Sequence, residues 1–535
     1  MLNKLIPYSE AKQKLTIRQK IGQLFMHAVF INDTEKNIAE TEQLIAKLNI
    51  GALCFFHSRE SAATNFEGKE DIVHNKNSYS RLKQLINRYQ KAAHVPLLIA
   101  IDAEWGLAMR IEDTNQYPYA LSLGALTDNE ELITEVGKQI ALDCARAGIH
   151  WNLAPVVDVN TNPKNPVIGY RAFGDNKHQV TKKADAFIKG MNSVGIINTL
   201  KHFPGHGDTD MDSHLGLPEI TKSVQEIWDN ELYPFQKLID KGVDAVMAGH
   251  LSIPEFDDTG NPSTTSSKII TDLLRESMGF EGVIISDALN MHAVSKKYQK
   301  KGILESKAFH AGMDMLCFSE YIEQGIDEIL SKEQSNRIER SFERVWSLKA
   351  KAQNIDLRDY VEVNDLNKLN SAIARRSITE LSSNSEIFAN FNTSEFMSVS
   401  LENDSKNYFS AKISSKYSGP HLILNNDTIE EVRSKSVNYE NLLIALFPNS
   451  VKPKNKFGID NVLLDTLNDL ISVKNVMLYL FGNPYFLYEL KLSSNCNIVV
   501  AYQDFKEFQE QAVHHFDGNL KAQGQLPFNF KYFVR

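Results

Sequence analysis

The hydrophobic pattern of residues 1–320 alternates short apolar runs with longer amphipathic stretches. The apolar runs are rich in β-branched and aromatic residues and have the length of strands. Eight such runs occur, at 23–30, 50–56, 96–102, 149–159, 195–204, 245–253, 282–289 and 313–318. The stretches between them have the period of amphipathic helices, for example at 129–147, 180–194, 223–241 and 271–278.

Strands that alternate with helices require right-handed crossovers and a parallel sheet. Eight of them in about 340 residues match the strand count of a (β/α)8 barrel. An open doubly wound sheet is the alternative, but the glycine-rich nucleotide motif that usually follows its first strand is absent. The pattern therefore favours a barrel.

A second, shorter series follows the helical pattern at 334–351, which we expect to be the last barrel helix. Residues 357–382 have the polar composition of a linker with helical pieces. Beyond them, apolar runs at 421–424, 441–447, 475–481 and 496–502 alternate with helical patterns at 459–472 and 505–515. We therefore predict a barrel domain over 1–355, a linker over 356–382 and a smaller α/β domain over 383–535.

Composition narrows the class of protein. The chain has 535 residues, 42% of them hydrophobic, and 58 Lys and Arg against 67 Asp and Glu give a net charge of −9. No basic block stands out, which argues against a nucleic-acid partner. No apolar run approaches the ~18 residues of a membrane-spanning helix, so no membrane partner is expected. A large soluble enzyme fits these values.

The four cysteines are Cys54, Cys144, Cys317 and Cys496, and they lie far apart in the sequence. Their spacing fits neither a zinc knuckle nor a disulfide scaffold, so we expect buried, reduced thiols. The polar N-terminal segment 1–20 has no apolar core of a secretion signal. A cytoplasmic location is therefore expected, or a periplasmic or secreted one if a signal peptide has been removed.

Unusual polar residues follow the predicted strands, and active sites of barrels lie at the carboxyl ends of their strands. A charged group directly after an apolar run is costly unless it has a partner or a function. A structural ion pair explains any single case, but five strand ends on one face point to a site. The residues concerned are Asp102, Glu104, Arg110, Asp158, Arg171, Lys201, His202, His250 and Asp287.

The loop after the fifth predicted strand carries the clearest chemistry. Its Pro and Gly residues over 204–207 suit a sharply turned loop rather than a helix or strand. Asp212 lies two residues before His214, so in an extended segment both side chains face the same way. The carboxylate can then fix the tautomer of the imidazole, as a general acid/base requires. A solvated polar loop without a role is the alternative.

The same loop also contains the ligand types of a metal site. The residues are His202, His206, Asp208, Asp210, Asp212 and His214. Metal-dependent hydrolases on barrels generally also need His-x-His on the first strand, where this chain has only His27. Catalytic zinc further needs three ligands on rigid elements. A metal-dependent hydrolase is kept as an alternative.

Residues 201–208 (KHFPGHGD), continuing to Asp212-Ser213-His214, resemble the signature of bacterial β-N-acetylhexosaminidases of glycoside hydrolase family 3. Residues 283–291 (VIISDALNM) are similar to the segment that carries the family's nucleophilic aspartate. Residues 169–174 (GYRAFG) and 248–250 (AGH) also fit. Towards the C-terminus, 480–485 (LFGNPY), 500–502 (VAY) and 524–527 (GQLP) resemble the family's second domain.

The resemblance implies a TIM-type barrel followed by a smaller α/β sandwich domain. It implies a retaining exo-β-N-acetylglucosaminidase in which Asp287 forms a covalent glycosyl-enzyme and His214, oriented by Asp212, is the acid/base. Both steps are proton and nucleophile chemistry, so no metal or organic cofactor is needed. The implied substrate is an oligosaccharide with a terminal N-acetylglucosamine, from cell-wall muropeptides or chitin. The implied sugar-binding residues are Asp102, Arg110, Arg171, Lys201 and His202.

The sequence also departs from the family pattern. After Asp102 and Glu104 the family usually has Gly-Gly and a basic residue, whereas this chain has the run 105–110 (WGLAMR). Asp102 and Arg110 keep the expected spacing. A β-glucosidase or xylosidase of the same family is an alternative, although that branch generally lacks the Asp-Ser-His element. A histidine acid/base also leaves phosphorolysis open. A catalytically dead sugar-binding protein should lack Asp287 or His214, and both are present.

Overall fold

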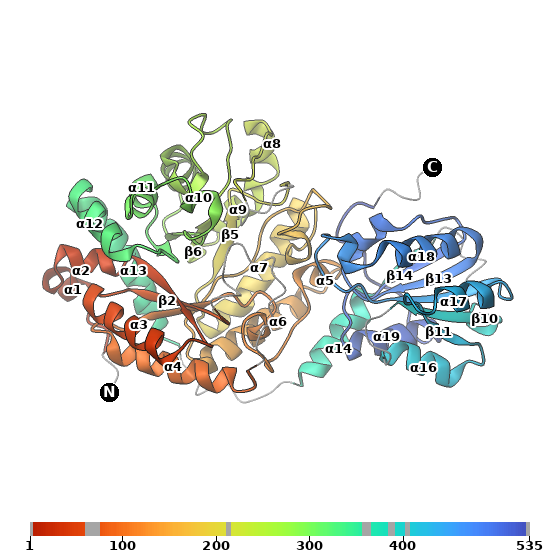
Figure 1. Ribbon diagram of the computed structural model, residues 1–535. Coiled ribbons are helices and arrows are strands. Elements are labelled where there is room, and N and C mark those ends of the chain that lie inside the picture. The colour runs from red at the N-terminus through yellow and green to blue at the C-terminus, as the bar shows by residue number, and fades with distance from the viewer. Residues whose placement is uncertain are drawn as a thin grey trace. The chain divides into compact units, whose positions relative to one another are not determined.

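The structure is a computed structural model that describes residues 4–58, 75–209, 216–355, 365–382, 391–401 and 407–530 (Figure 1). The chain forms two compact units, each built from several segments. The first unit comprises residues 1–117, 133–160 and 177–362, and the second comprises 118–132, 161–176 and 363–535. No helix of the described residues is both long and apolar enough to cross a membrane.

The first unit contains parallel strands within all eight predicted runs. They are β1 (Phe25–Phe30), β2 (Ala52–Phe56), β3 (Leu98–Ile101), β4 (Trp151–Asn152), β5 (Thr199–Phe203), β6 (Ala245–Ala248), β7 (Val283–Ser286) and β8 (Leu316–Cys317). They pair in the orders β4-β3-β2-β1-β8 and β5-β6-β7. Isolated parallel bridges join Trp151 to Ile197 and Ile285 to Met315, next to the outer strands of the two sets. The predicted α/β architecture on a parallel sheet is confirmed.

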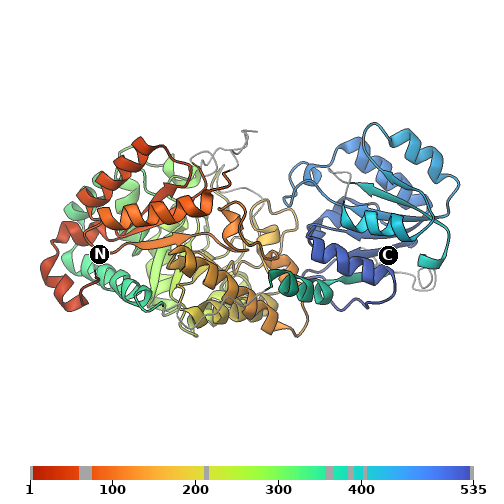
Figure 2. The ribbon, with the colours of Figure 1, turned by 90° about the horizontal axis from the view of Figure 1, so that it is seen from below.

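Helices connect these strands and lie around their outside (Figure 2). They are α1 (Tyr8–Lys14), α2 (Ile17–Gly22), α3 (Glu35–Leu48), α4 (Ser78–Ala92), α6 (Glu130–Ala147), α7 (Lys177–Val194), α8 (Val224–Asp229), α9 (Leu232–Ile239), the π-helix η4 (Lys268–Ser277), α10 (His292–Ser295), α11 (Ile303–Ala311), α12 (Ile322–Lys332) and α13 (Ser335–Ala352). Short 3₁₀ turns are η1 (Leu107–Met109) and η3 (Ser263–Thr265).

The helix predicted over 223–241 is in fact two helices, α8 and α9. Ser223 begins α8 with a capping box, in which its hydroxyl accepts from the amide of Glu226 and Glu226 accepts from the amide of Ser223. The chain leaves helical geometry at Asn230 (φ −120°). Pro234 has no N–H to donate and is tolerated only in a first helical turn. A second helix that begins at Leu232 puts Pro234 in that turn.

The second unit has a six-stranded sheet in the order β11-β10-β12-β13-β14-β9. Its strands are β9 (Thr379–Ser382), β10 (Phe396–Leu401), β11 (His421–Ile423), β12 (Asn441–Leu446), β13 (Asn475–Leu480) and β14 (Cys496–Val500). All pairs are parallel except that between β14 and β9. β9 and β10 were not predicted, and β9 lies inside the predicted linker. Both contain serine or threonine: Ser398 and Ser400 of β10 are buried, and Ser398 is hydrogen-bonded to His421 (2.7 Å).

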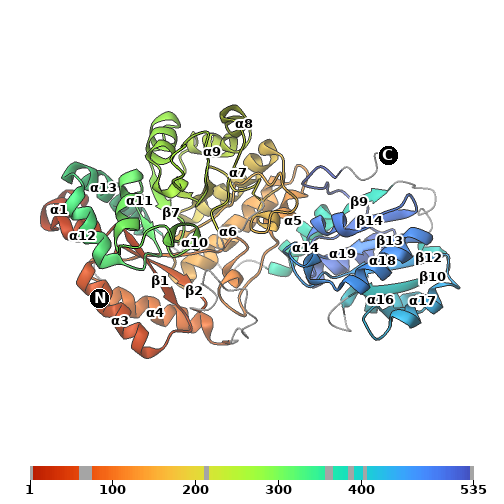
Figure 3. The same ribbon diagram turned by 45° about the horizontal axis from the view of Figure 1, so that its top comes forward.

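Helices cover both faces of this second sheet (Figure 3). α17 (Ile429–Ser436) and α18 (Asn461–Val473) contribute Val432 and Leu467 to the hydrophobic core on one face. α16 (Tyr408–Lys416) and α19 (Lys506–Phe516) contribute to the core on the other face. The unit also contains α14 (Leu366–Ser377), η5 (Phe391–Thr393), η6 (Lys456–Gly458) and η7 (Pro484–Glu489).

Two segments from between the strands of the first unit belong to the second. They carry α5 (Ala120–Gly124) and the 3₁₀ turn η2 (Gly169–Arg171). The amide of Gln525 donates to the carbonyl of Ala125 (3.0 Å), and the amide of Asp175 donates to that of Pro527 (3.0 Å). Leu121 and Ala125 lie in the same hydrophobic core as β12 and β13. The second unit is therefore built from segments far apart in the sequence.

Candidate active site

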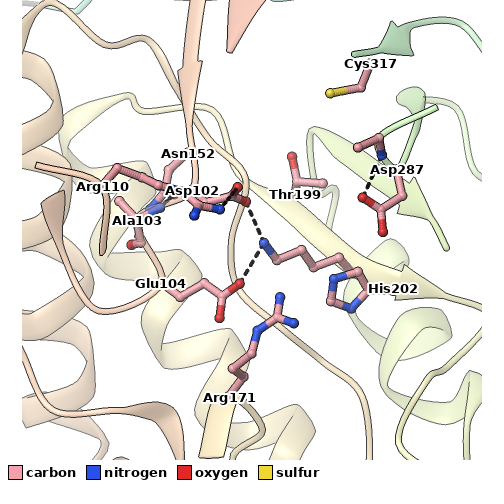
Figure 4. A network of polar contacts seen from close by, with 12 residues as sticks. Asp102, Ala103, Glu104, Arg110, Asn152, Arg171, Thr199, His202, Asp287 and Cys317 are labelled. Atoms are coloured by element: carbon pink, nitrogen blue, oxygen red, sulfur yellow. Dashed lines mark hydrogen bonds and ion pairs between the residues drawn. The ribbon is translucent and has the colours of Figure 1, made fainter. Parts of the chain in front are cut away.

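A buried ion-pair network lies where β3 and β5 end. Asp102 follows β3 and Lys201 lies on β5, and their Oδ1 and Nζ atoms are 2.9 Å apart (Figure 4). The same Nζ lies 2.8 Å from Oε1 of Glu104, and Nη2 of Arg110 lies 2.7 Å from Oδ2 of Asp102. Lys201 is only 2% exposed. The structure thus brings together three of the predicted sugar-binding residues and adds Glu104.

The two cations of this network, Lys201 and Arg110, keep Asp102 ionised. Burial alone raises the pKa of Asp102, but the charges and hydrogen bonds of Lys201 and Arg110 outweigh it and hold that pKa well below its ordinary value. Asp102 is therefore an anion at neutral pH. Nε of Arg110 is a buried donor for which the described residues provide no acceptor. Such a donor favours a ligand that brings an oxygen.

A side chain on β4, that of Asn152, holds the backbone segment that carries Asp102 and Glu104. Asn152 accepts a hydrogen bond from the amide of Ala103 (3.0 Å) and donates to the carbonyl of the same residue (3.1 Å). Asn152 is fully buried. This double contact holds the chain between Asp102 and Glu104, so that both carboxylates face Lys201.

A second pair joins His202, next along β5, to Asp158. Nδ1 of His202 lies 2.8 Å from Oδ2 of Asp158, whose carboxylate also accepts from the amides of His202 (3.1 Å) and His206 (2.7 Å). Burial raises the pKa of Asp158, but His202 outweighs it and lowers that pKa. A carboxylate at Nδ1 fixes the orientation and the tautomer of the ring. The sequence marked Asp158 only as a strand-end residue.

The glycines after β5 have a steric reason. A Cβ at Gly207 would lie 1.9 Å from the carbonyl oxygen of Val159, so only glycine fits there. This close approach brings His206 within reach of Asp158, and Nδ1 of His206 lies 2.7 Å from the hydroxyl of Thr209. The predicted acid/base residues Asp212 and His214 lie outside the described residues, so their pairing stays a prediction.

Asp287 directly follows β7, as predicted. Its amide donates to the carbonyl of Ala248 on β6 (2.9 Å), and its Oδ1 accepts from the amide of Ala288 (2.7 Å). The carboxylate is thus held by backbone contacts at the end of the strand. His250 lies beside it: Nε2 contacts the carbonyl oxygen of Ala288 (3.0 Å), and Nδ1 contacts the hydroxyl of Thr264 (2.6 Å).

Arg171, the remaining predicted sugar-binding residue, lies in η2 of the second unit. Its Nη1 donates to the carbonyl of Val167 (3.4 Å), and the neighbouring Tyr170 ring packs edge-to-face on Tyr119 with centroids 4.8 Å apart. Its role in the site stays a prediction.

The alternative of a metal site draws on the loop after β5. Three of the six candidate ligand residues lie outside the described residues, namely Asp210, Asp212 and His214. Of the others, His202 and His206 use Nδ1 for Asp158 and Thr209. The described residues contain no group of three or more His, Cys, Asp or Glu side chains that could hold a metal ion.

Taken together, the carboxyl ends of β3, β5 and β7 carry one carboxylate held by a backbone amide and two buried polar networks. Charged donors and acceptors held in this way discriminate strongly between ligands, because a buried polar group left unmatched is costly. This arrangement suits a ligand rich in hydroxyl groups. Asp287 has the geometry of a fixed nucleophile or base.

Known proteins are similar to this chain in sequence. A beta-hexosaminidase A from Pseudoalteromonas piscicida is 32% identical over 341 residues, which cover 58% of this chain and 55% of that protein. A protein from Cellulomonas fimi named beta-N-acetylglucosaminidase/beta-glucosidase is 28% identical over 352 residues, which cover 62% of this chain and 57% of that protein. The chain therefore spans little more than half the length of these relatives.

A solved structure extends the similarity to the second unit. The glycoside hydrolase family 3 beta-N-acetylglucosaminidase from Paenibacillus sp. str. FPU-7 superposes with a TM-score of 0.78 at 26% identity, over 97% of this chain and 100% of that one. The family model described as the glycosyl hydrolase family 3 N terminal domain matches residues 16–348. That match covers more than half of the chain, and the chain therefore belongs to glycosyl hydrolase family 3.

Proposed function

We propose that the chain is a retaining β-N-acetylglucosaminidase that removes terminal β-linked N-acetylhexosamine from oligosaccharides. The observation that carries the proposal is the position of Asp287, which the amide of Ala288 holds at the end of β7. The Asp102–Lys201–Arg110 network joins the carboxyl end of β3 to β5, and β5 belongs to the same set of parallel strands as β7. The names of the relatives and of the Paenibacillus structure support this substrate class.

The proposed scaffold is a closed TIM-type barrel over 1–355, a linker over 356–382 and an α/β sandwich domain over 383–535. The isolated bridges from Trp151 to Ile197 and from Ile285 to Met315 support closure, because they continue the pairing from β4 towards β5 and from β7 towards β8. In such a barrel all active-site side chains converge on one end.

In the proposed mechanism, Asp287 attacks the anomeric carbon and forms a covalent glycosyl-enzyme. His214, oriented by Asp212, protonates the leaving oxygen in this step and then removes a proton from the attacking water. The hydrogen bond from the amide of Ala288 supports the first step, since it holds the carboxylate in place. Two displacements at the same carbon retain its configuration.

We assign recognition of the non-reducing sugar to Asp102, Arg110, Arg171, Lys201 and His202. Asp102, Arg110 and Lys201 form one ion-pair network. In the proposed complex, the carboxylate accepts hydrogen bonds from sugar hydroxyls, and the two cations donate to sugar oxygens. His202 contributes a further polar contact, with its ring oriented by Asp158 through Nδ1.

Asp287→Asn tests the nucleophile. The amide is isosteric but cannot attack, so turnover of p-nitrophenyl N-acetyl-β-glucosaminide is expected to fall by roughly 10³-fold or more. Asp258→Asn is the matched control, because its carboxylate is 83% exposed and pairs with the surface residue Lys268. Near-wild-type turnover by Asp287→Asn would contradict the assignment.

A β-glucosidase or xylosidase activity is the second candidate, and the double name of the Cellulomonas fimi relative favours testing it. Aryl glycosides that differ only at C2 separate the two, because only the N-acetylglucosaminidase should require the acetamido group. A metal-dependent hydrolase would lose activity in EDTA, whereas the proposed mechanism needs no metal. Phosphate added as acceptor tests phosphorolysis by the appearance of a sugar 1-phosphate.

The natural substrate we propose is a muropeptide fragment of cell-wall recycling, handled in the cytoplasm, with chitin fragments as the alternative. Matched assays on a muropeptide disaccharide and on chitobiose test this choice. A kcat/KM at least as high for chitobiose would favour the chitin-type substrate.

A further inference from the structure

Three sulfur atoms meet where β1, β2 and β8 run side by side. Met26 lies on β1, Cys54 on β2 and Cys317 on β8, and β1 pairs with both of the other strands. Met26 is the register partner of Cys317, and Ala28, two residues further along, is the partner of Cys54. Residues two apart point to the same face of a strand, so the three side chains share one face. We call these residues the sulfur cluster.

The sulfur atoms of this cluster are close together and buried. Sγ of Cys317 lies 3.8 Å from Sδ of Met26. A hydrogen bond to Cys54, together with burial, raises the pKa of the Cys317 thiol well above its ordinary value. All three residues are buried: Met26 and Cys54 are 0% exposed and Cys317 is 3% exposed.

The sulfur cluster lies next to the candidate active site. The charges of Asp287 and Asp102 both act on the Cys317 thiol. Cys317 lies on the Asp287 side of the polar network in Figure 4, and its amide donates to Oγ of Ser286, the residue before Asp287. An ion held by the sulfur cluster would therefore lie beside the proposed nucleophile.

The strand arrangement disfavours a disulfide between the two cysteines. β2 and β8 are separated by β1, so their backbones are about 9 Å apart, close to two strand spacings. A disulfide needs Cα atoms within roughly 7 Å. The thiols of Cys54 and Cys317 can approach each other, but the backbones are too far apart for the covalent bond.

A metal ion fits where a disulfide does not. With metal–sulfur bonds of about 2.3 Å, two ligands at tetrahedral or trigonal angles lie roughly 3.8–4.0 Å apart. The observed separation of the Cys317 and Met26 sulfurs, 3.8 Å, falls in this range. Two thiols and a thioether are soft ligands, which select Cu(I) and related d10 ions over Mg²⁺ or Ca²⁺.

We propose that Met26, Cys54 and Cys317 form a binding site for one soft d10 metal ion of the Cu(I) class. Each thiol that binds the ion releases one proton, and no atom changes oxidation state. The filled site, one cation and two thiolates, carries a net charge of −1. It inhibits the enzyme, because this charge lies beside Asp287 and repels that carboxylate from its place at the sugar. The inhibition rests on the proposed function, whereas the binding does not.

Silver ion binding to the full-length protein tests the site. We expect the wild type to retain one Ag⁺ per chain after desalting, measured by elemental analysis, and to release two protons, measured in a pH-stat. Cys54→Ala/Cys317→Ala should lower the affinity for Ag⁺ by roughly 100-fold or more. Cys144→Ala/Cys496→Ala is the matched control, because it also removes two buried thiols, one in α6 and one in β14.

Met26→Leu is a milder variant that keeps the volume of the side chain and removes only the thioether. It should bind Ag⁺ roughly 10-fold more weakly while folding normally, which keeps the test decisive if the double cysteine variant does not fold. Equal Ag⁺ affinity in the wild type and the cluster variants, or loss of binding only in the Cys144/Cys496 control, would overturn the proposal.

Inhibition is measured separately, as the Ag⁺ concentration that halves turnover, which should be roughly 10-fold higher for Met26→Leu than for the wild type. Binding without inhibition would overturn the inhibitory role alone. If the protein has no glycosidase activity at all, the stoichiometry and proton release still test the site, so failure of the proposed function and failure of the metal site are distinguishable.

Discussion

At the scale of single residues, Lys201 is the cation on which the sugar-binding network depends. Its ammonium group lies between Asp102 (2.9 Å) and Glu104 (2.8 Å), and its side chain is 2% exposed. Without it, two carboxylates face each other in a site with little water, where their repulsion is screened weakly. The positions of Asp102 and Glu104 therefore depend on this one charge.

Lys201→Met tests that dependence. Truncating one partner of a buried charged pair costs roughly 2–5 kcal/mol, so kcat/KM is expected to fall by about 1.5 to 3.5 orders of magnitude. Steady-state kinetics with an aryl N-acetylglucosaminide give the measurement, and the melting temperature reports the structural share of the loss. Lys268→Met is the control, since its ion pair with Asp258 lies at the surface and its side chain is 51% exposed. Equal effects of the two substitutions would contradict this role for Lys201.

Much of the residue-scale site could be predicted from the sequence. Asp102, Lys201 and Asp287 stand at predicted strand ends, where a charged residue after an apolar run is informative. The partners were harder to assign, because Asp158 and His202 are 44 residues apart and Glu104 pairs with Lys201 on a different strand. The contact that His250 makes with the backbone after Asp287 was not predicted either, since no local pattern joins these segments.

At the scale of elements, α13 ties the amino-terminal ends of two strands together. Lys349 on this helix donates to the carbonyls of Gly51 (2.7 Å), before β2, and Pro96 (2.5 Å), before β3. Burial lowers the pKa of Lys349 to about 7. No acidic side chain in the described part of the chain forms a salt bridge with it. The helix thus holds a buried amine among carbonyl dipoles.

This amine makes stability depend on pH in a definite direction. The folded pKa lies below the ordinary value of 10.5, so between pH 7 and about 10 the unfolded chain binds more protons than the folded one. The contribution of Lys349 to stability therefore rises with pH through this window. Below pH 7 the amine is charged in both states and carries its full burial penalty.

Lys349→Met is expected to remove this pH dependence. The stability of the wild type relative to the variant should rise by a few kcal/mol from pH 7 to 10, because only the wild type loses a buried proton on folding. Urea unfolding of both proteins across this range measures the difference. A difference that stays constant with pH, or falls, would contradict the assigned cause.

The elements themselves show what a hydrophobic pattern can and cannot predict. The eight apolar runs of the first unit each contain a strand, because strands buried in a parallel sheet must be apolar throughout. β9 and β10 were missed, since β9 is a short antiparallel edge strand and β10 alternates Ser398 and Ser400 with apolar residues. The break between α8 and α9 was also missed. Pro234 was the signal for it, because proline fits the first turn of a new helix better than the middle of a long one.

At the scale of the whole molecule, the second unit is not a continuous piece of chain. Leu121, from a segment before β4, is 1% exposed and belongs to the hydrophobic core that also contains Leu442 and Ile444 of β12. The side chain of Gln503 donates to the hydroxyl of Ser122 (2.8 Å). The hydrophobic pattern could not predict this packing, because the segment lies far along the chain from the strands that it contacts.

Leu121→Ala in the full-length chain is therefore expected to destabilise the second unit. Removing a fully buried leucine side chain costs roughly 2–5 kcal/mol. Hydrogen exchange should become faster at the backbone amides of β12 and β13 and stay unchanged at those of β2 and β3. Leu330→Ala is the control, because that leucine is 39% exposed. Unchanged exchange in β12 and β13 would show that the segment contributes nothing to the stability of this unit.

The central claim for the molecule is that Asp287 becomes covalently glycosylated during turnover, and peptide mapping tests it most directly. His214→Ala, which lacks the proposed base, should accumulate the glycosyl-enzyme on an activated aryl N-acetyl-β-glucosaminide, because the leaving group then needs no acid and water is no longer activated. After rapid acid quenching and digestion, mass spectrometry should find one N-acetylhexosamine on the peptide that contains Asp287. An adduct on any other residue, or no adduct together with inversion at the anomeric carbon, would contradict the account.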